Sequence, residues 1–187
     1  MPRVYLSPST QDFNLFINGG NEEYYMNQIV DAMIPYLRAS GIEFTRSNPG
    51  DSISRSIERS NEIPHDLHLA LQTTSTPDGT HAPLRGIDLF YYATSSISGE
   101  KAAYIIYENL KKIYPVPELV SFVPTLTLLE MALTDAPSVL VELGYHDNLQ
   151  DALWIEDNIN EIARNLAISV ADFLNVPFVE PQHLIIT

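Results

Sequence analysis

The side chains that could bind a transition metal in this sequence are histidines and carboxylates, because the chain contains no cysteine. Disulfides and thiolate metal sites are excluded for the same reason. The five histidines are spread along the chain, at His65, His68, His81, His146 and His183. A transition-metal centre in this protein would therefore combine imidazole nitrogens with carboxylate oxygens.

Polar residues lie at or after the ends of three apolar segments that are predicted to be strands. The first segment is followed by the loop 9–23, which contains Glu23. The second ends in Gln72, Thr73 and Thr74, and Glu142 lies near the end of the third. In open α/β sheets, ligands bind at the carboxyl ends of the strands. We therefore expect these three places to lie around one cleft.

The hydrophobic periodicity alternates between the two-residue step of strands and the three- and four-residue steps of helices. It predicts strands at 4–6, 42–46, 66–72, 86–92 and 137–143, and helices at 22–40, 52–61, 98–113, 126–133 and 151–174. The stretch 118–125 has no clear pattern. This order predicts a single α/β domain over residues 1–176, with a largely parallel, twisted sheet flanked by helices on both faces. Residues 177–187 form a C-terminal tail, either an ordered edge or the remnant of a linker.

Composition narrows the possible partners. The chain has 187 residues, 45% hydrophobic content and a formal net charge of -14, with no stripe of Lys or Arg. Such a surface does not favour nucleic acid, and no apolar stretch approaches the ~20 residues needed to span a bilayer. The first residues leave no room for a signal peptide. We expect a cytoplasmic protein unless it leaves the cell by a non-classical route, acting at the cell wall if it is active.

Two stretches resemble a known family. They are Val4-Tyr5-Leu6-Ser7-Pro8-Ser9-Thr10-Gln11 with the later Glu22-Glu23-Tyr24-Tyr25-Met26-Asn27, and the block Thr134-Asp135-Ala136-Pro137-Ser138-Val139-Leu140-Val141-Glu142-Leu143-Gly144-Tyr145-His146-Asp147-Asn148. They are similar to the zinc-dependent N-acetylmuramoyl-L-alanine amidases of type 3, in the subgroup from spore-forming Gram-positive bacteria and their phages. The resemblance covers nearly the whole chain and implies the amidase/phosphorylase-like α/β fold.

The resemblance also implies a set of site residues. The family cleaves the amide between the lactyl group of N-acetylmuramic acid and the first L-alanine of peptidoglycan, using zinc held by two His and one Glu, with a second Glu as general base. The ligand Glu matches Glu23 and the base matches Glu142. The two ligand histidines match Phe13 and Gln72, and a basic residue common in the family matches Ala132.

The other histidines offer few replacements. His68 faces the same side of its predicted strand as Gln72, but four residues of strand span roughly 13 Å, so we expect a core or helix-facing imidazole. A rewired zinc site could draw on His81 and His146 together with Glu23. A second alternative is an oxygen-only site for Mg2+ or Ca2+ that combines the two matched glutamates with the Gln72 carbonyl.

The changed positions lead to three hypotheses of function. The first is a peptidoglycan-related, amidase-fold protein that is catalytically impaired or inactive, holds no metal, and keeps a cleft lined by Thr73, Thr74 and Ala132 for a muropeptide or a protein partner. The second is an active amidase that uses zinc in a rewired site. The third is a structural or regulatory interaction module.

Overall fold

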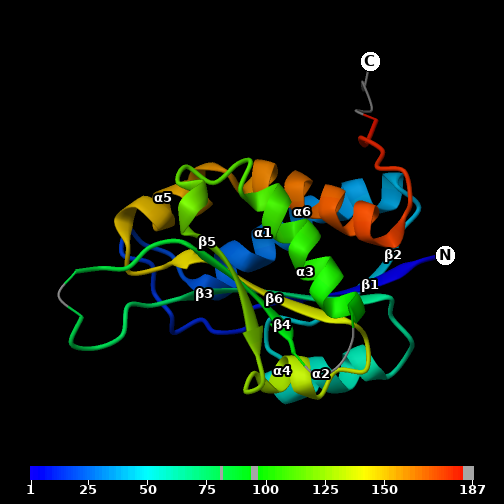
Figure 1. The fold of residues 1–187 in the computed structure, drawn as a ribbon, viewed down its shortest axis with the longest axis horizontal. Coiled ribbons are helices and arrows are strands. Elements are labelled where there is room, and N and C mark those ends of the chain that lie inside the picture. Colours follow the sequence, from blue (N-terminus) through cyan, green and yellow to red (C-terminus); the bar gives the residue numbers. More distant parts are fainter. Residues whose placement is uncertain (81, 94–96, 183–187) are drawn as a thin grey trace.

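The computed structural model describes residues 1–80, 82–93 and 97–182, which form an α/β domain (Figure 1). In chain order the elements are β1 (Arg3–Pro8), α1 (Glu22–Ala39), β2 (Glu43–Arg46), α2 (Ile53–Asn61), β3 (Leu67–Thr74), β4 (Ile87–Tyr92), α3 (Ile97–Leu110), the 3₁₀ turn η1 (Pro117–Leu119), β5 (Val120–Thr125), α4 (Leu129–Ala132), β6 (Ser138–Tyr145), α5 (Leu149–Asp157) and α6 (Ile159–Leu174).

The strands form one six-stranded sheet in the order β2-β1-β3-β6-β4-β5. All neighbouring strands are parallel except β4 and β6, which are antiparallel. The carboxyl ends of β1, β3 and β6 therefore meet at one edge of the sheet. The predicted fold class, a largely parallel sheet with helices on both faces, is confirmed.

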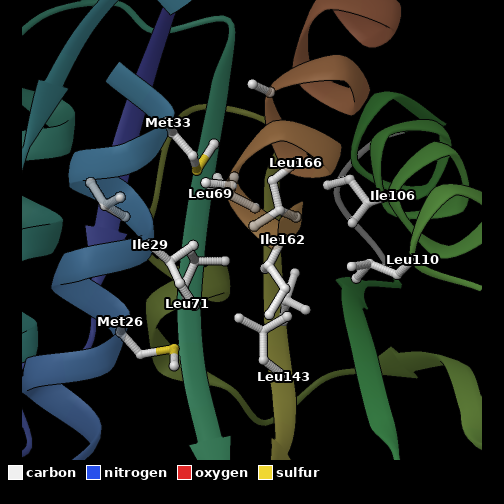
Figure 2. Packing of buried hydrophobic residues seen from close by; sticks show 14 of the residues in the cluster. Met26, Ile29, Met33, Leu69, Leu71, Ile106, Leu110, Leu143, Ile162 and Leu166 are labelled. Atoms are coloured by element: carbon white, nitrogen blue, oxygen red, sulfur yellow. The ribbon is translucent and has the colours of Figure 1, made fainter. Parts of the chain in front are cut away.

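The helices cover the two faces of the sheet unequally. Figure 1 shows α1, α3 and α6 on one face and the short helices α2 and α4 on the other. The first face holds the main hydrophobic core, where side chains of α1, α3 and α6 meet those of β3 and β6 (Figure 2). Burial of this many aliphatic side chains is the main stabilising term of the domain.

Side-chain alternation along the strands divides the residues between these faces. On β3, Leu69 and Leu71 point into the main core, while Ala70 belongs to a small second cluster with Leu140 and Met131 under α4. The same alternation places neighbouring residues near the strand ends on opposite faces of the sheet. Only residues that point to the same face can share a site.

Capping side chains fix where several helices begin. Asn21 accepts a hydrogen bond from the backbone N–H of Tyr24 at the start of α1, and Ser52 accepts one from Arg55 at the start of α2. Asn148 accepts from two backbone N–H groups at the start of α5. Each cap satisfies donors that the first helical turn leaves unpaired.

Two features differ from the sequence prediction. The single helix expected over 151–174 is two helices, α5 and α6, which are separated at Asn158. The stretch without a pattern contains η1 and the edge strand β5, which pairs with β4 in parallel. The strand prediction failed there because an edge strand needs no alternating pattern when helices cover only part of it.

The start of the C-terminal tail packs against the domain. The ring of Phe178 stacks on Tyr36 of α1 at 5.8 Å, and the guanidinium of Arg164 lies over the same ring at 5.4 Å. Within the described ranges, no helix is both long enough and apolar enough to cross a bilayer.

Candidate functional site

Glu142 lies in β6 between two polar side chains of the neighbouring strands. Its direct partner on β3 is Gln72, and its direct partner on β4 is Asp88. Residues directly opposite each other in a sheet point to the same face. The structure therefore aligns an amide and two carboxylates across three strands near the carboxyl end of β6.

Glu142 has an unusual acidity. Burial raises its pKa to about 7, with further contributions from the negative charges of Asp88 and Glu22, while a hydrogen bond with the Thr74 side chain acts in the opposite direction. A carboxyl group with a pKa near neutrality can both accept and donate a proton at physiological pH. Such a pKa suits a general acid or base. It also allows the carboxyl group to stay protonated and act as a neutral hydrogen-bond donor.

The amide of Gln72 is oriented by a buried carboxylate. Its Nε2 donates to Oε2 of Glu130 at 3.3 Å, and the other oxygen of Glu130 accepts from Ser7 Oγ at 2.5 Å and from His68 Nε2 at 3.0 Å. Glu130 is only 6% exposed, and the far nitrogen of His68 reaches Ser60 Oγ at 2.9 Å. The network links β1, β3, α2 and α4.

His68 lies in this network, as a buried imidazole that faces α2. The expectation of a core or helix-facing histidine is therefore confirmed.

Phe13 projects from the loop after β1. Its side chain is 72% exposed, and Leu15 and Ile17 on the same loop are also exposed. The loop itself is anchored, because the backbone N–H of Ile17 donates to the carbonyl of His146 at 2.9 Å. The ring of Phe13 is thus presented to solvent and is not buried in a repacked pocket.

Glu23 points to a different hollow from Gln72. It lines a hollow with Thr10, Asp12 and Asp51, and its Oε1 accepts from Asn27 Nδ2 at 3.3 Å. Gln72 lines a smaller hollow with Ser9, Gln11 and Glu130, and Thr10 lines both. The loop around Thr10 therefore lies between the two residues.

The neighbouring residue Glu22 is the carboxylate that the structure places against the end of β3. It is fully buried, and its Oε2 accepts from Thr73 Oγ1 and from Asn14 Nδ2, each at 2.8 Å. Nδ1 of His146 lies 3.0 Å from Thr73 Oγ1 and 3.9 Å from Glu22 Oε2. The other carboxylate oxygen of Glu22 has no hydrogen-bond partner among the described residues.

The remaining predicted residues lie at different distances from this cluster. Thr73 faces α1 and joins Glu22, whereas Thr74 bonds Glu142. Ala132 is the last residue of α4, two positions from Glu130. His81 and His183 lie outside the described residues.

The donor atoms do not fit a zinc site of two histidines and one carboxylate. Phe13 has no donor atom, and the Gln72 amide is a weak ligand that is already bonded to Glu130. His146 lies beside Glu22 and Thr73. In the part of the chain that the structure describes, no three His, Asp or Glu side chains converge closely enough to hold a metal ion.

Three polar residues of this region were missed from the sequence, namely Glu22, Asp88 and Glu130. A signal existed for Glu22, because it lies four and seven residues before Met26 and Ile29 and so shares their buried helix face. Asp88 follows the apolar start of a predicted strand, but its partner strand could not be derived from the sequence. Glu130 lies in a helix of four residues, which is too short for periodicity to assign a face.

Comparisons with known proteins agree with this fold. Residues 10–173 match the family model described as N-acetylmuramoyl-L-alanine amidase. A search of curated protein sequences finds no match.

Several solved structures are similar. The amidase AmiC2 of Nostoc punctiforme superposes with a TM-score of 0.80 at 16% identity, covering 93% of this chain and 97% of that one. The catalytic domain of CwlV from Bacillus (Paenibacillus) polymyxa var. colistinus gives 0.77 at 16% identity, over 95% and 100% of the two chains. The CwlD amidase of Clostridioides difficile, solved in complex with the GerS lipoprotein, gives 0.77 at 15% identity, over 94% and 99%.

Proposed function

Because the chain belongs to the N-acetylmuramoyl-L-alanine amidase family, we propose that it is a peptidoglycan-related member that binds a muropeptide without hydrolysing it. The observation that carries this proposal is the donor chemistry at two positions. An exposed phenyl ring stands at Phe13 and an amide at Gln72, where the resemblance places the two zinc-binding histidines. Without imidazoles there, the remaining carboxylates lack the ligands that an amidase zinc ion requires.

The residues that remain suit binding of a peptide or an amide. Gln72 and Thr74 supply uncharged hydrogen-bonding groups, and Glu142, with a pKa of about 7, can act as donor or acceptor. The hydroxyl and amide groups of Ser9 and Gln11 line the adjacent hollow. We assign Glu142 the role of a polar contact for the bound stem peptide in place of the general-base role that the resemblance implies.

Metal content tests the proposal most directly. Protein purified without chelator is expected to carry far less than one zinc ion per chain, and incubation with peptidoglycan is expected to release no new L-alanine amino groups. Stoichiometric zinc, together with cleavage that Glu142→Gln removes, would instead establish an active amidase with a rewired site. Chemical-shift changes at Gln72 and Thr74 on addition of a muramoyl peptide would support binding.

Restoring the two side chains tests whether the backbone has kept the family geometry. Because Glu23 lines a different hollow from Gln72 and the Phe13 side chain is exposed, the double variant Phe13→His with Gln72→His is expected to gain little zinc affinity. The matched control adds Glu23→Gln to the double variant and should bind zinc equally weakly. Tight zinc binding by the double variant that Glu23→Gln removes would show that the three positions do come together as a zinc site.

A second candidate function, docking of a protein partner, is favoured by the exposed apolar loop. Phe13, Leu15 and Ile17 are each more than half exposed. One structural neighbour, CwlD, is solved with a lipoprotein partner. The variants Leu15→Ser and Ile17→Ser distinguish the two candidate functions. Each should weaken a complex with a protein partner and leave muropeptide binding unchanged.

A further inference from the structure

An aromatic cluster lies between α3 and the edge strand β5, on the main-core side of the sheet. Figure 1 shows α3 on the same face of the sheet as α1 and α6. The ring of Phe122 stacks on Tyr91 at 4.6 Å and meets the rings of Tyr104 and Tyr107 edge-on or tilted, each at 5.9 Å. The four rings therefore pack against one another as one cluster. Tyr104 is nevertheless 53% exposed.

A hollow of about 240 Å³ opens over this cluster. It is lined by Tyr104 and Phe122 together with Glu100 and Lys101 at the start of α3. Aromatic rings beside a few polar groups are the usual lining of a small-molecule or sugar subsite. Phe122 is paired with Leu89 and packs on the main-core face of the sheet, whereas Asp88 and Glu142 alternate to the opposite face, so the hollow and the cleft lie on different faces.

The charge of this surface differs from that of the whole protein. The chain has a formal net charge of -14, yet its three lysines, Lys101, Lys111 and Lys112, all lie in α3 or directly after it. Lys111 lies over the Tyr107 ring at 4.7 Å, and Lys112 donates to Asn109. Lys101 has no hydrogen-bond or ion-pair partner within the described residues, so its ammonium group is free to pair with an anion.

These side chains form a stripe along α3. Residues 101, 104, 107/108 and 111 follow the three- and four-residue spacing of one helix face, over about 15 Å. The stripe therefore has a lysine at each end and two tyrosines between them, along a length that exceeds a single sugar ring, and Lys111 is ion-paired with Glu108 at 3.6 Å. A ligand that matches it has flat apolar faces and a negative charge at the Lys101 end.

We propose that the hollow between α3 and β5 is a second binding site of the protein, which holds a pyranose ring of an N-acetylated glycan chain against Tyr104 and Phe122. A carboxylate of the chain pairs with Lys101. This inference rests on the proposed peptidoglycan-related function, because that function supplies the glycan. The site binds the sugar backbone, whereas the cleft at Gln72 and Glu142 binds the peptide.

The chemistry favours this ligand over two others. A basic protein segment could pair with Glu100 but would leave the ammonium of Lys101 without an anionic partner. A purely apolar partner would leave the ammonium of Lys101 and the carboxylate of Glu100 desolvated without a hydrogen bond. A glycan that bears lactyl carboxylates offers ring faces, hydroxyl groups and negative charge together.

Nuclear magnetic resonance of the isotope-labelled chain tests the site with two probes. One is a neutral N-acetylglucosamine tetramer, and the other is peptide-free glycan prepared from peptidoglycan, which carries free lactyl carboxylates. Both should shift the resonances of Lys101, Tyr104 and Phe122. Tyr104→Ala should weaken the binding of both probes by about fivefold, since a ring contact of this kind contributes about 1 kcal/mol.

The lysine is tested by comparing the probes. Lys101→Gln should weaken the binding of the carboxylate-bearing glycan by about threefold and leave the binding of the neutral tetramer unchanged. Added salt should have the same selective effect on the original protein. Lys112→Gln is the matched control for charge. Tyr24→Ala is the matched control for the ring, because Tyr24 is exposed to the same extent as Tyr104, 53%.

The outcomes separate this inference from the proposed function. If neither probe shifts the α3 and β5 resonances, or if Tyr104→Ala behaves like Tyr24→Ala, the second site does not exist. If a muramoyl peptide still shifts Gln72 and Thr74 in that case, the proposed function stands without it. If glycan binds at α3 while muramoyl peptides do not bind at the cleft, the proposed peptide site fails and the glycan site remains.

Discussion

The acidity of Glu142 has a direct consequence for stability. Its pKa is about 7 in the folded protein and 4.5 in an ordinary solvated Glu. The folded state therefore holds the proton more tightly, and this contribution to stability is fully present below pH 4.5 and is lost as the pH rises toward 7. Above that pH, the partly buried carboxylate is ionised beside Asp88 and opposes folding.

The variant Glu142→Gln removes this ionisation and keeps the shape of the side chain. It should be more stable than the original protein at pH 8, by up to about 3 kcal/mol, and the advantage should disappear near pH 4. Urea unfolding at a series of pH values measures it. The exposed Glu161 of α6 provides the control, because Glu161→Gln should show no such trend. A pH-independent difference for Glu142→Gln would mean that the carboxyl has an ordinary pKa.

For single residues, burial could be predicted from the sequence where a hydrophobic pattern repeats. It could not be predicted where it depends on contacts between distant segments. The exposure of Phe13 could not be predicted, because it depends on how the loop is anchored at His146. Glu22 and Glu23 are adjacent and chemically identical, and only the helix face separates them. The family resemblance singled out Glu23, while burial and hydrogen bonding single out Glu22.

Among the elements, the short helices α2 and α4 depend on polar contacts. Glu130 of α4 accepts hydrogen bonds from Ser7, His68 and Gln72 through its two oxygens. In Glu130→Gln one acceptor oxygen becomes an NH2 group, which leaves a buried donor unpaired. We expect a loss of about 2–4 kcal/mol in the free energy of unfolding.

Hydrogen exchange and urea unfolding check this second prediction. Amide protection should fall first in α2, because Ser60 of α2 is tied to Glu130 through His68. Glu161→Gln, on the exposed side of α6, should change stability by no more than about 0.5 kcal/mol. Unchanged stability in Glu130→Gln would show that the network only fills space.

The elements themselves were largely predictable, since strong amphipathic periodicity marks α1 and α6 and apolar runs mark β1, β3 and β6. Two errors have physical causes. The break between α5 and α6 at Asn158 interrupts a hydrophobic pattern that continues through it, so periodicity gave one helix. The edge strand β5 was missed because its sequence shows no alternating pattern. The antiparallel pairing of β4 with β6, which the prediction of a largely parallel sheet left open, is a long-range choice that no local pattern encodes.

On the scale of the whole molecule, the boundary of the domain can be tested at its C-terminal end. We proposed residues 1–176 as the folding unit and 177–187 as a tail. Phe178 nevertheless packs between Tyr36 and Arg164, and the backbone N–H of Val179 donates to Ser40 Oγ at 3.0 Å. These contacts connect the tail to α1 and α6, the two long helices of the main core.

The variant Phe178→Ala should have a free energy of unfolding that is lower by about 1–2 kcal/mol, because it lacks a half-buried aromatic ring and its contact with Arg164. Ending the chain after Val176 should lower the free energy of unfolding by a similar amount. Unfolding should remain cooperative, since the core of α1, α3 and α6 is intact. Thermal unfolding of both forms measures this, with the exposed Val179→Ala as a control that should stay within about 0.5 kcal/mol. Loss of cooperative unfolding on truncation would place the domain boundary beyond Val176 and make the tail part of the fold.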